Sequence, residues 1–218
     1  EYSSGANYLN QDIWTFEDNL SWYLGNHTLS FGTHNEFYNF KNLFIQASNG
    51  EYVYNSVDDF LNDNVYSFVY NYTDENLTGS RRWAAPFKAG QLGFYAQDKW
   101  DISTALQLTY GLRIDIPLYL NSPATNDEFN KSDYATKNGV KVGQKPNSSV
   151  LVSPRVGFRW FANDDHSTTL RGGAGIFNGR APFVWLSNIW TNTGVNQKGT
   201  TIYKDNAPEL SFDKYGAD

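Results

Sequence analysis

The sequence predicts an all-β fold, and within that class an antiparallel transmembrane β-barrel segment. Two runs carry the prediction. Every even position of residues 105–116 is apolar, and in residues 150–160 the even positions are again apolar while the odd ones include arginine and glycine. Successive side chains of a strand point to opposite sides, so each run has one apolar and one polar face. A sheet that is apolar outside and polar inside is what a transmembrane β-barrel requires.

Composition agrees with this fold class and excludes several others. Aromatic residues make up 17% of the 218 residues, which is consistent with the aromatic girdles that a membrane barrel carries at both membrane interfaces. Cysteine is absent, which excludes disulfides and thiolate metal sites. The formal net charge is −6 and the charges are scattered, so no basic stripe suggests nucleic-acid binding. The mean hydropathy of −0.57 does not argue against a barrel, because half of each strand faces water.

The predicted elements follow in order along the chain. A strand hairpin spans residues 11–40 and turns at Gly25-Asn26-His27, and a long loop at 41–87 contains a helical turn at 57–61 and a short strand at 65–72. A second hairpin spans 88–116, a second long loop 117–149, and a third hairpin 150–178. A further strand is expected within 183–195, followed by a tail to residue 218. Short turns on one side and long loops on the other are typical of outer-membrane barrels.

Two segments of the sequence resemble a known family. Gly93-Phe94-Tyr95-Ala96-Gln97-Asp98-Lys99-Trp100, followed by Leu106–Asp115, resembles a hairpin of TonB-dependent outer-membrane receptors. Ser153-Pro154-Arg155-Val156-Gly157-Phe158, with Thr169–Phe177 and the trailing Gly179-Arg180-Ala181-Pro182, is similar to the next hairpin and to the Oar-like receptors of Bacteroidota.

The resemblance implies a barrel of 22 antiparallel strands around an N-terminal plug, in the outer membrane of a Gram-negative bacterium. It implies import of a nutrient, a peptide or glycan fragment, with energy passed through TonB. The expected partners are outer-membrane lipids, the protein's own plug domain, TonB and a surface lipoprotein. Because the chain has room for only part of such a barrel and does not begin with methionine, we expect an internal fragment that lacks the plug domain.

The candidate site residues form two groups. Four arginines share the polar parity with Asp115, and their cost of about 2–4 kcal/mol at the lipid midplane predicts that they point into the lumen: Arg113, Arg155, Arg159 and Arg171. They contact the plug or the substrate path, or they form a structural charge network between strands, which is the interpretation we favour. Aromatic residues of the first long loop are candidates for ligand contact outside the cell: Tyr52, Tyr54, Tyr66, Tyr70, Tyr72 and Trp83.

Other chemistry finds no support in the sequence. The three histidines lack metal-ligand spacing, no nucleophile motif is present, and we expect no enzyme, cofactor or metal site. Asp98 lies on the apolar parity beside Trp100, which predicts a position at the membrane interface. Two alternatives to the receptor stay open: a passive outer-membrane porin without a plug, and a soluble β-sandwich that binds carbohydrate through exposed aromatic residues.

Overall fold

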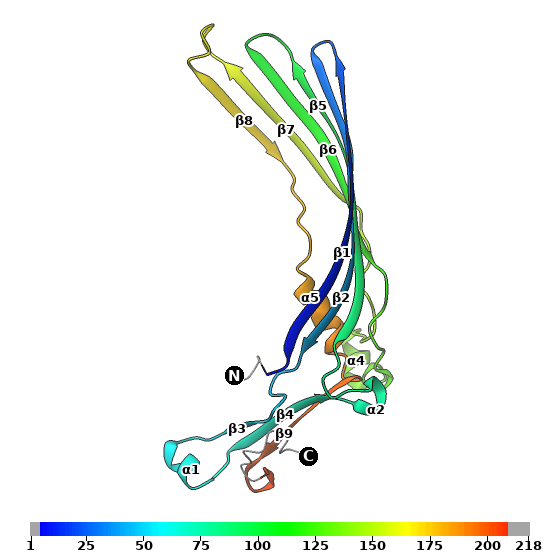
Figure 1. Cartoon of the computed structure of the whole chain (residues 1–218), viewed down its shortest axis with the longest axis vertical. Coiled ribbons are helices and arrows are strands. Elements are labelled where there is room, and N and C mark those ends of the chain that lie inside the picture. The colour runs from blue at the N-terminus through cyan, green and yellow to red at the C-terminus, as the bar shows by residue number, and fades with distance from the viewer. Residues whose placement is uncertain (1–4, 209–218) are drawn as a thin grey trace.

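The computed structural model describes residues 5–208 and shows two sheets. The larger sheet has six antiparallel strands in the order β1-β2-β5-β6-β7-β8. These strands are β1 (Asn7–Leu24), β2 (His27–Phe44), β5 (Ala85–Asp101), β6 (Leu106–Tyr119), β7 (Leu151–Phe161) and β8 (Thr169–Gly175). Each strand pairs with the next one in this order, so the sheet is a simple up-and-down meander. It forms one curved wall (Figure 1).

The three predicted hairpins are the strand pairs of this wall. Strands β1 and β2 turn at Gly25, whose φ of +57° is the left-handed conformation that glycine adopts without strain. Both strands are 18 residues long, about 60 Å at a rise of 3.3–3.4 Å per residue. That length exceeds what a tilted strand needs to cross the membrane, so the hairpin extends beyond the lipid at the end opposite its turn.

The register of the strands produces one continuous apolar face. Cross-strand neighbours such as Trp22 with Leu29, Trp100 with Leu108, and Leu108 with Phe158 stand on it. The side chains of this face are exposed or half-buried although they are apolar. The residues that are at least 39% exposed include Trp14, Phe16, Leu20, Trp22, Phe94, Leu112, Val156, Phe158, Trp160 and Leu170. An apolar surface of this size on a folded sheet is built to meet lipid.

The apolar face has defined limits and one interruption. Beyond Trp14 and Phe37, toward the long-loop end, the outward positions become polar, as at Asp12 and Lys88. Near mid-height the apolar face is broken at Thr33 and its neighbours Asp18 and Asn35. The Thr33 hydroxyl donates to the carbonyl oxygen of Gly93 at 3.0 Å, and the Asn35 amide donates to Thr33 at 2.7 Å. These bonds satisfy part of the hydrogen-bonding capacity of Thr33 and Asn35 on the apolar face.

The smaller sheet lies at the long-loop end of the wall (Figure 1). Its three strands are β3 (Glu51–Val53), β4 (Ser67–Thr73) and β9 (Gln197–Tyr203), in the order β3-β4-β9. Short helices accompany it: α1 (Val57–Leu61) and α2 (Glu75–Thr78) in the first long loop, and α3 (Asp127–Asn130) and α4 (Asp133–Asn138) in the second. A 3-10 turn, Lys204–Asn206, follows β9. The expected helical turn at 57–61 and the short strand at 65–72 are thus present.

The strand expected within 183–195 is wrong. Residues Phe183–Thr191 form helix α5, the strand that follows it is β9, and β9 joins the smaller sheet rather than the wall. Helix α5 is anchored by Leu186 and Trp190, four residues apart and therefore on one side of the helix, both buried against the wall. This tertiary packing overrides the β-forming tendency of the segment's aromatic and β-branched residues.

The soluble β-sandwich is also wrong. In residues 5–208 the smaller sheet stands at the end of the wall and does not cover its apolar face (Figure 1). A sandwich would bury that face between two sheets.

Candidate functional site

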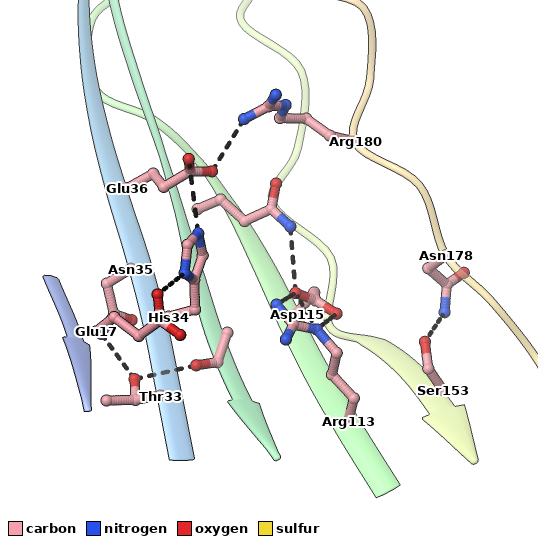
Figure 2. A network of polar contacts seen from close by, with 12 residues as sticks. Glu17, Thr33, His34, Asn35, Glu36, Arg113, Asp115, Ser153, Asn178 and Arg180 are labelled. Carbon is pink, nitrogen blue, oxygen red and sulfur yellow. Dashed lines mark hydrogen bonds and ion pairs between the residues drawn. The ribbon is translucent and has the colours of Figure 1, made fainter. Parts of the chain in front are cut away.

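The polar face of the wall carries a brace on β6 between Arg113 and Asp115. The Arg113 Nε lies 2.9 Å and 3.0 Å from the two carboxylate oxygens of Asp115, and its Nη2 lies 2.8 Å from one of them. The Gln91 amide donates to the same carboxylate at 3.2 Å. Asp115 is only 3% exposed, so these donors satisfy a buried charge. The ion pair of Arg113 therefore lies within β6, and the Gln91 amide on β5 is the contact that links Asp115 to the neighbouring strand (Figure 2).

A second network joins the wall to the segment between β8 and α5 (Figure 2). The Arg180 Nη1 donates to the Glu36 carboxylate at 2.9 Å and also to the Tyr38 hydroxyl, which in turn donates to Glu36. His34 lies between two carboxylates, 3.2 Å from Glu17 and 3.6 Å from Glu36. Sequence reasoning missed this network because Arg180 lies 144 residues after Glu36 and no local pattern links them.

Helix α5 packs on the same polar-parity face, near the long-loop end. There the inward positions of β2 and β5 are aromatic or small rather than polar. The Phe183 ring lies 4.5 Å from the Tyr38 ring and 4.7 Å from the Phe40 ring, between centroids, and Trp190 lies 5.5 Å from Phe87. Arg180 adds a cation–π contact at 5.2 Å from the Phe183 ring. The helix therefore occupies space inside the curve of the wall.

The other three predicted arginines differ from Arg113. Arg155, Arg159 and Arg171 are exposed on the polar face of β7 and β8, and within residues 5–208 none forms an ion pair or a side-chain hydrogen bond. The contact observed for Arg159 is with the Phe161 ring, 5.9 Å from its centroid. The interpretation that we favour, a charge network between neighbouring strands, therefore stays a prediction for these three arginines, and the ion pair of Arg113 lies within β6.

The aromatic candidates of the first long loop fall into two groups: one forms a row on the smaller sheet, and the other lies elsewhere. Tyr52, Phe68, Tyr70 and Tyr72 form a continuous row on one face of the smaller sheet, with successive ring centroids 4.7, 6.3 and 5.4 Å apart. The last two contacts are stacked, so each ring covers part of its neighbour's face. The row thus offers mainly ring edges and hydroxyl groups to a ligand.

The remaining aromatic candidates lie elsewhere. Tyr54 packs edge-on against Phe60 and donates to Asp63 at 3.0 Å. Tyr66 contacts Tyr203. Trp83 packs against the buried cluster beneath α5. The structure therefore brings three of the six predicted contact residues, Tyr52, Tyr70 and Tyr72, into one row.

Sequence reasoning missed a polar cavity of about 420 Å³ between the smaller sheet, the end of β2 and α5. Five carboxamide side chains line it, together with Lys198: Gln46, Asn71, Asn188, Asn192 and Gln197. Asn71 and Gln197 use their amide groups to bond the backbone carbonyls of Gln46 and Phe44, at 2.9 and 3.2 Å. Asn188 and Asn192 are exposed and lie one helical turn apart. The five carboxamide residues are polar in the sequence, but they come together only because Phe183–Thr191 forms helix α5, where the sequence predicts a strand.

An ion pair fixes β9 to the start of α2 beside this cavity. The Lys198 ammonium lies 2.6 Å from the Asp74 carboxylate, and Asp74 also caps α2 by accepting from the Asn76 backbone. The hydrogen bond from Lys198 lowers the pKa of Asp74 below its ordinary value. The same bond raises the pKa of Lys198.

A polar cluster on the lipid-facing side explains Asp98. Its carboxylate accepts from the Tyr110 hydroxyl at 2.7 Å and pairs with the His27 ring at the same distance. His27 also stacks on Trp100, with ring centroids 5.2 Å apart. The cluster lies close to the short turns, where aromatic residues with a polar end suit the membrane interface.

A comparison with protein families decides what this wall is. Residues 1–214 match the family model described as an outer membrane beta barrel domain. The chain belongs to this family. Its apolar face is therefore the lipid-facing side of an outer-membrane barrel in a Gram-negative bacterium, and its polar face is the lumenal side. A search of curated proteins and a search of solved structures each gave no significant match.

Two features are absent from the part of this barrel domain that the structure describes. No helix in it is long and apolar enough to cross a membrane. No group of three or more His, Cys, Asp or Glu residues in it is arranged to hold a metal ion.

Proposed function

We propose that this chain is a wall section of a TonB-dependent outer-membrane receptor of the Oar-like type, which imports a small nutrient. The resemblance of the 88–116 and 150–178 hairpins to such receptors supports the proposal. The structural observation that carries it is the polar cavity at the long-loop end, beside a helix that occupies the inner side of the wall. A receptor needs a built binding site above its lumen, whereas a passive pore needs only an open mouth.

The proposed receptor has several partners. Outer-membrane lipids contact the apolar face, and the protein's own plug domain fills the lumen in the closed state. TonB supplies energy from the periplasmic side, where the short turns lie, and a surface lipoprotein covers the extracellular end. Edge strands β1 and β8 have one neighbour each within residues 5–208, and further wall strands would pair with their free edges.

The cavity chemistry favours a neutral, polar ligand. A carboxamide offers both donors and an acceptor, so it pairs equally well with the hydroxyl groups of a glycan fragment or with the amides of a short peptide. Lys198 is the lone ammonium group of the lining, and Asp74 already neutralises it.

Reconstitution of the full-length source protein tests the receptor proposal. We expect no stable conductance in a planar lipid bilayer, because a plug closes the lumen, and we expect binding to the purified periplasmic domain of TonB. Open channels in steady steps together with no TonB binding would contradict the proposal and identify a passive porin.

The ligand class has its own test. Binding of trialanine and of maltotriose to the full-length protein is measured by calorimetry. We expect one of the two to bind, and we expect N188A/N192A to weaken that binding about tenfold or more, since each lost hydrogen bond is worth about 0.5–1.5 kcal/mol. The matched control is N76A, an exposed asparagine on α2 outside the cavity lining. Binding of neither probe, or equal weakening by N76A, would contradict a neutral-ligand site here.

A further inference from the structure

The lumenal face of β7 and β8 concentrates positive charge without a counter-charge. Arg155, Arg159 and Arg171 are exposed there, and within residues 5–208 no carboxylate lies within ion-pair distance of any of them. The contrast with Arg113 is direct, because Arg113 stands on the neighbouring strand β6 and is fully engaged by Asp115. The wall therefore supplies an acid for one lumenal arginine and none for the next three.

Two of these arginines face each other across the sheet. Arg159 of β7 and Arg171 of β8 are directly opposed in the strand register. Side chains in such a pair have Cβ atoms about 4.5–5.5 Å apart, and like charges in that position destabilise a sheet. An anionic group placed between the two guanidinium groups converts this repulsion into two attractive contacts.

The third arginine reaches the same place because the row between has no side chains. Gly157 and Gly173 are opposed to each other in that row. Arg155 and Arg159 lie four residues apart on β7, about 13 Å along the strand. The Arg159 guanidinium lies over the Phe161 ring, 5.9 Å from its centroid, so its long side chain must turn toward Gly157 to meet Arg155 above the glycines. A Cβ added to Gly157 would meet only the Gly172 carbonyl oxygen, at an ordinary 3.5 Å. Packing within the described wall thus leaves the space above Gly157 open.

We propose that Arg155, Arg159 and Arg171 form a lumenal site for an anionic group, a carboxylate or a phosphate, held above the floor of Gly157 and Gly173. Guanidinium groups present planar pairs of donors that match both anions. Two sources carry this chemistry: a small anion that enters the lumen, and a carboxylate on another segment of the same protein inside the barrel. The site requires only the barrel wall, so it stands or fails separately from coupling to TonB.

The test compares R159Q/R171Q with the unaltered full-length protein in detergent. The thermal midpoint of each is measured at constant ionic strength with increasing inorganic phosphate. The control is K41Q/K88Q, which removes the same number of positive charges from exposed outward positions beyond the apolar face. This control separates the site from the general effect of phosphate on stability.

Two results support the proposal and identify the source. If a small anion binds, the midpoints of the unaltered protein and of K41Q/K88Q rise with the logarithm of the phosphate concentration above the dissociation constant, and R159Q/R171Q needs about tenfold more phosphate or more for the same rise. If a carboxylate of the same protein occupies the site, phosphate shifts the midpoints of all three proteins equally, and R159Q/R171Q melts at a lower temperature than both others without phosphate.

One result overturns the proposal. If phosphate shifts the midpoint of R159Q/R171Q as much as those of the other two proteins, and R159Q/R171Q melts at the same or a higher temperature than the unaltered protein without phosphate, the arginines are merely hydrated and mutually repulsive. The glycine floor then holds no anion.

Discussion

The wall and the extracellular head, the smaller sheet with its helices, are built from the same kinds of residues but by different rules. In the wall, each strand pairs with the next wall strand along the chain, and lipid on one side and water on the other impose strict alternation. In the head, β4 pairs with β9 although residues 73 and 197 are far apart in the chain. Local pattern therefore specifies the wall, whereas long-range packing specifies the head and the cavity beneath it.

The largest expected effect concerns the helix that connects the two regions. Truncation of Trp190 to alanine removes a buried indole from the contact between α5 and Phe87, and such a loss costs about 3–5 kcal/mol. We expect α5 to detach while the wall stays folded, seen as faster amide hydrogen exchange confined to residues 183–203. The control is W185A on the same helix, whose indole is 66% exposed. Equal exchange in both variants would show that α5 does not depend on this contact.

The next effect tests whether one face of the wall contacts lipid and the other contacts water. Phe31 and Ser30 are adjacent on β2 but point to the lipid and to the lumen. Arginine at position 31 costs about 2–4 kcal/mol near the membrane midplane, whereas arginine at position 30 enters water. We expect F31R to fold poorly into lipid vesicles and S30R to fold normally, measured by the heat-dependent shift in electrophoresis. Similar folding yields for F31R and S30R would contradict the assignment of position 31 to lipid and position 30 to the lumen.

A smaller effect sharpens the distinction among the lumenal arginines. R113Q removes the charge that neutralises buried Asp115, and we expect a loss of about 1–3 kcal/mol in stability. R155Q removes an arginine that has no carboxylate partner within residues 5–208, so we expect a much smaller change. Urea unfolding of both variants in detergent measures the difference. If R155Q costs as much as R113Q, the two arginines are not distinct in role.

The smallest effect is a pH dependence of the head alone. The pKa of Asp74 is lowered in the folded state by Lys198, so this carboxylate favours folding once it is ionised. The contribution is fully present above the ordinary aspartate pKa and is lost as pH falls through the lower folded pKa. We expect the protection of amides in β9 and α2, measured as exchange relative to the intrinsic rate at each pH, to fall below about pH 4, and D74N to show lower protection already at neutral pH. Exchange in D74N that matches the unaltered protein would contradict a role for this pair.

The sequence predicts the wall better than it predicts the head and helix α5. The hairpins at 11–40, 88–116 and 150–178 were predicted because lipid and water enforce alternation in each strand. The second hairpin begins earlier than predicted, at Ala85, because the lumenal positions Phe87 and Ala89 face α5 instead of water and break the alternation. The third hairpin ends at Gly175, short of its predicted end at residue 178. Helix α5 was assigned as a strand because its helical state depends on contacts with residues about 100 positions earlier.

The candidate residues show a similar limit. Parity placed Arg113, Arg155, Arg159 and Arg171 on one face correctly, but the sequence could not distinguish the paired arginine from the unpaired ones. The carboxamide cavity needs residues from β2, β4, α5 and β9 together, and no local pattern joins them.

One measurement tests most directly whether one face of β6 contacts lipid and the other contacts the lumen. The 218 residues contain no cysteine, so single cysteines can be introduced at each of positions 106–116 and spin-labelled in lipid vesicles. Even positions should be accessible to molecular oxygen, which dissolves in lipid, and odd positions to a water-soluble nickel chelate. Accessibility that does not alternate along this strand would contradict the assignment of an outward lipid face and an inward lumenal face.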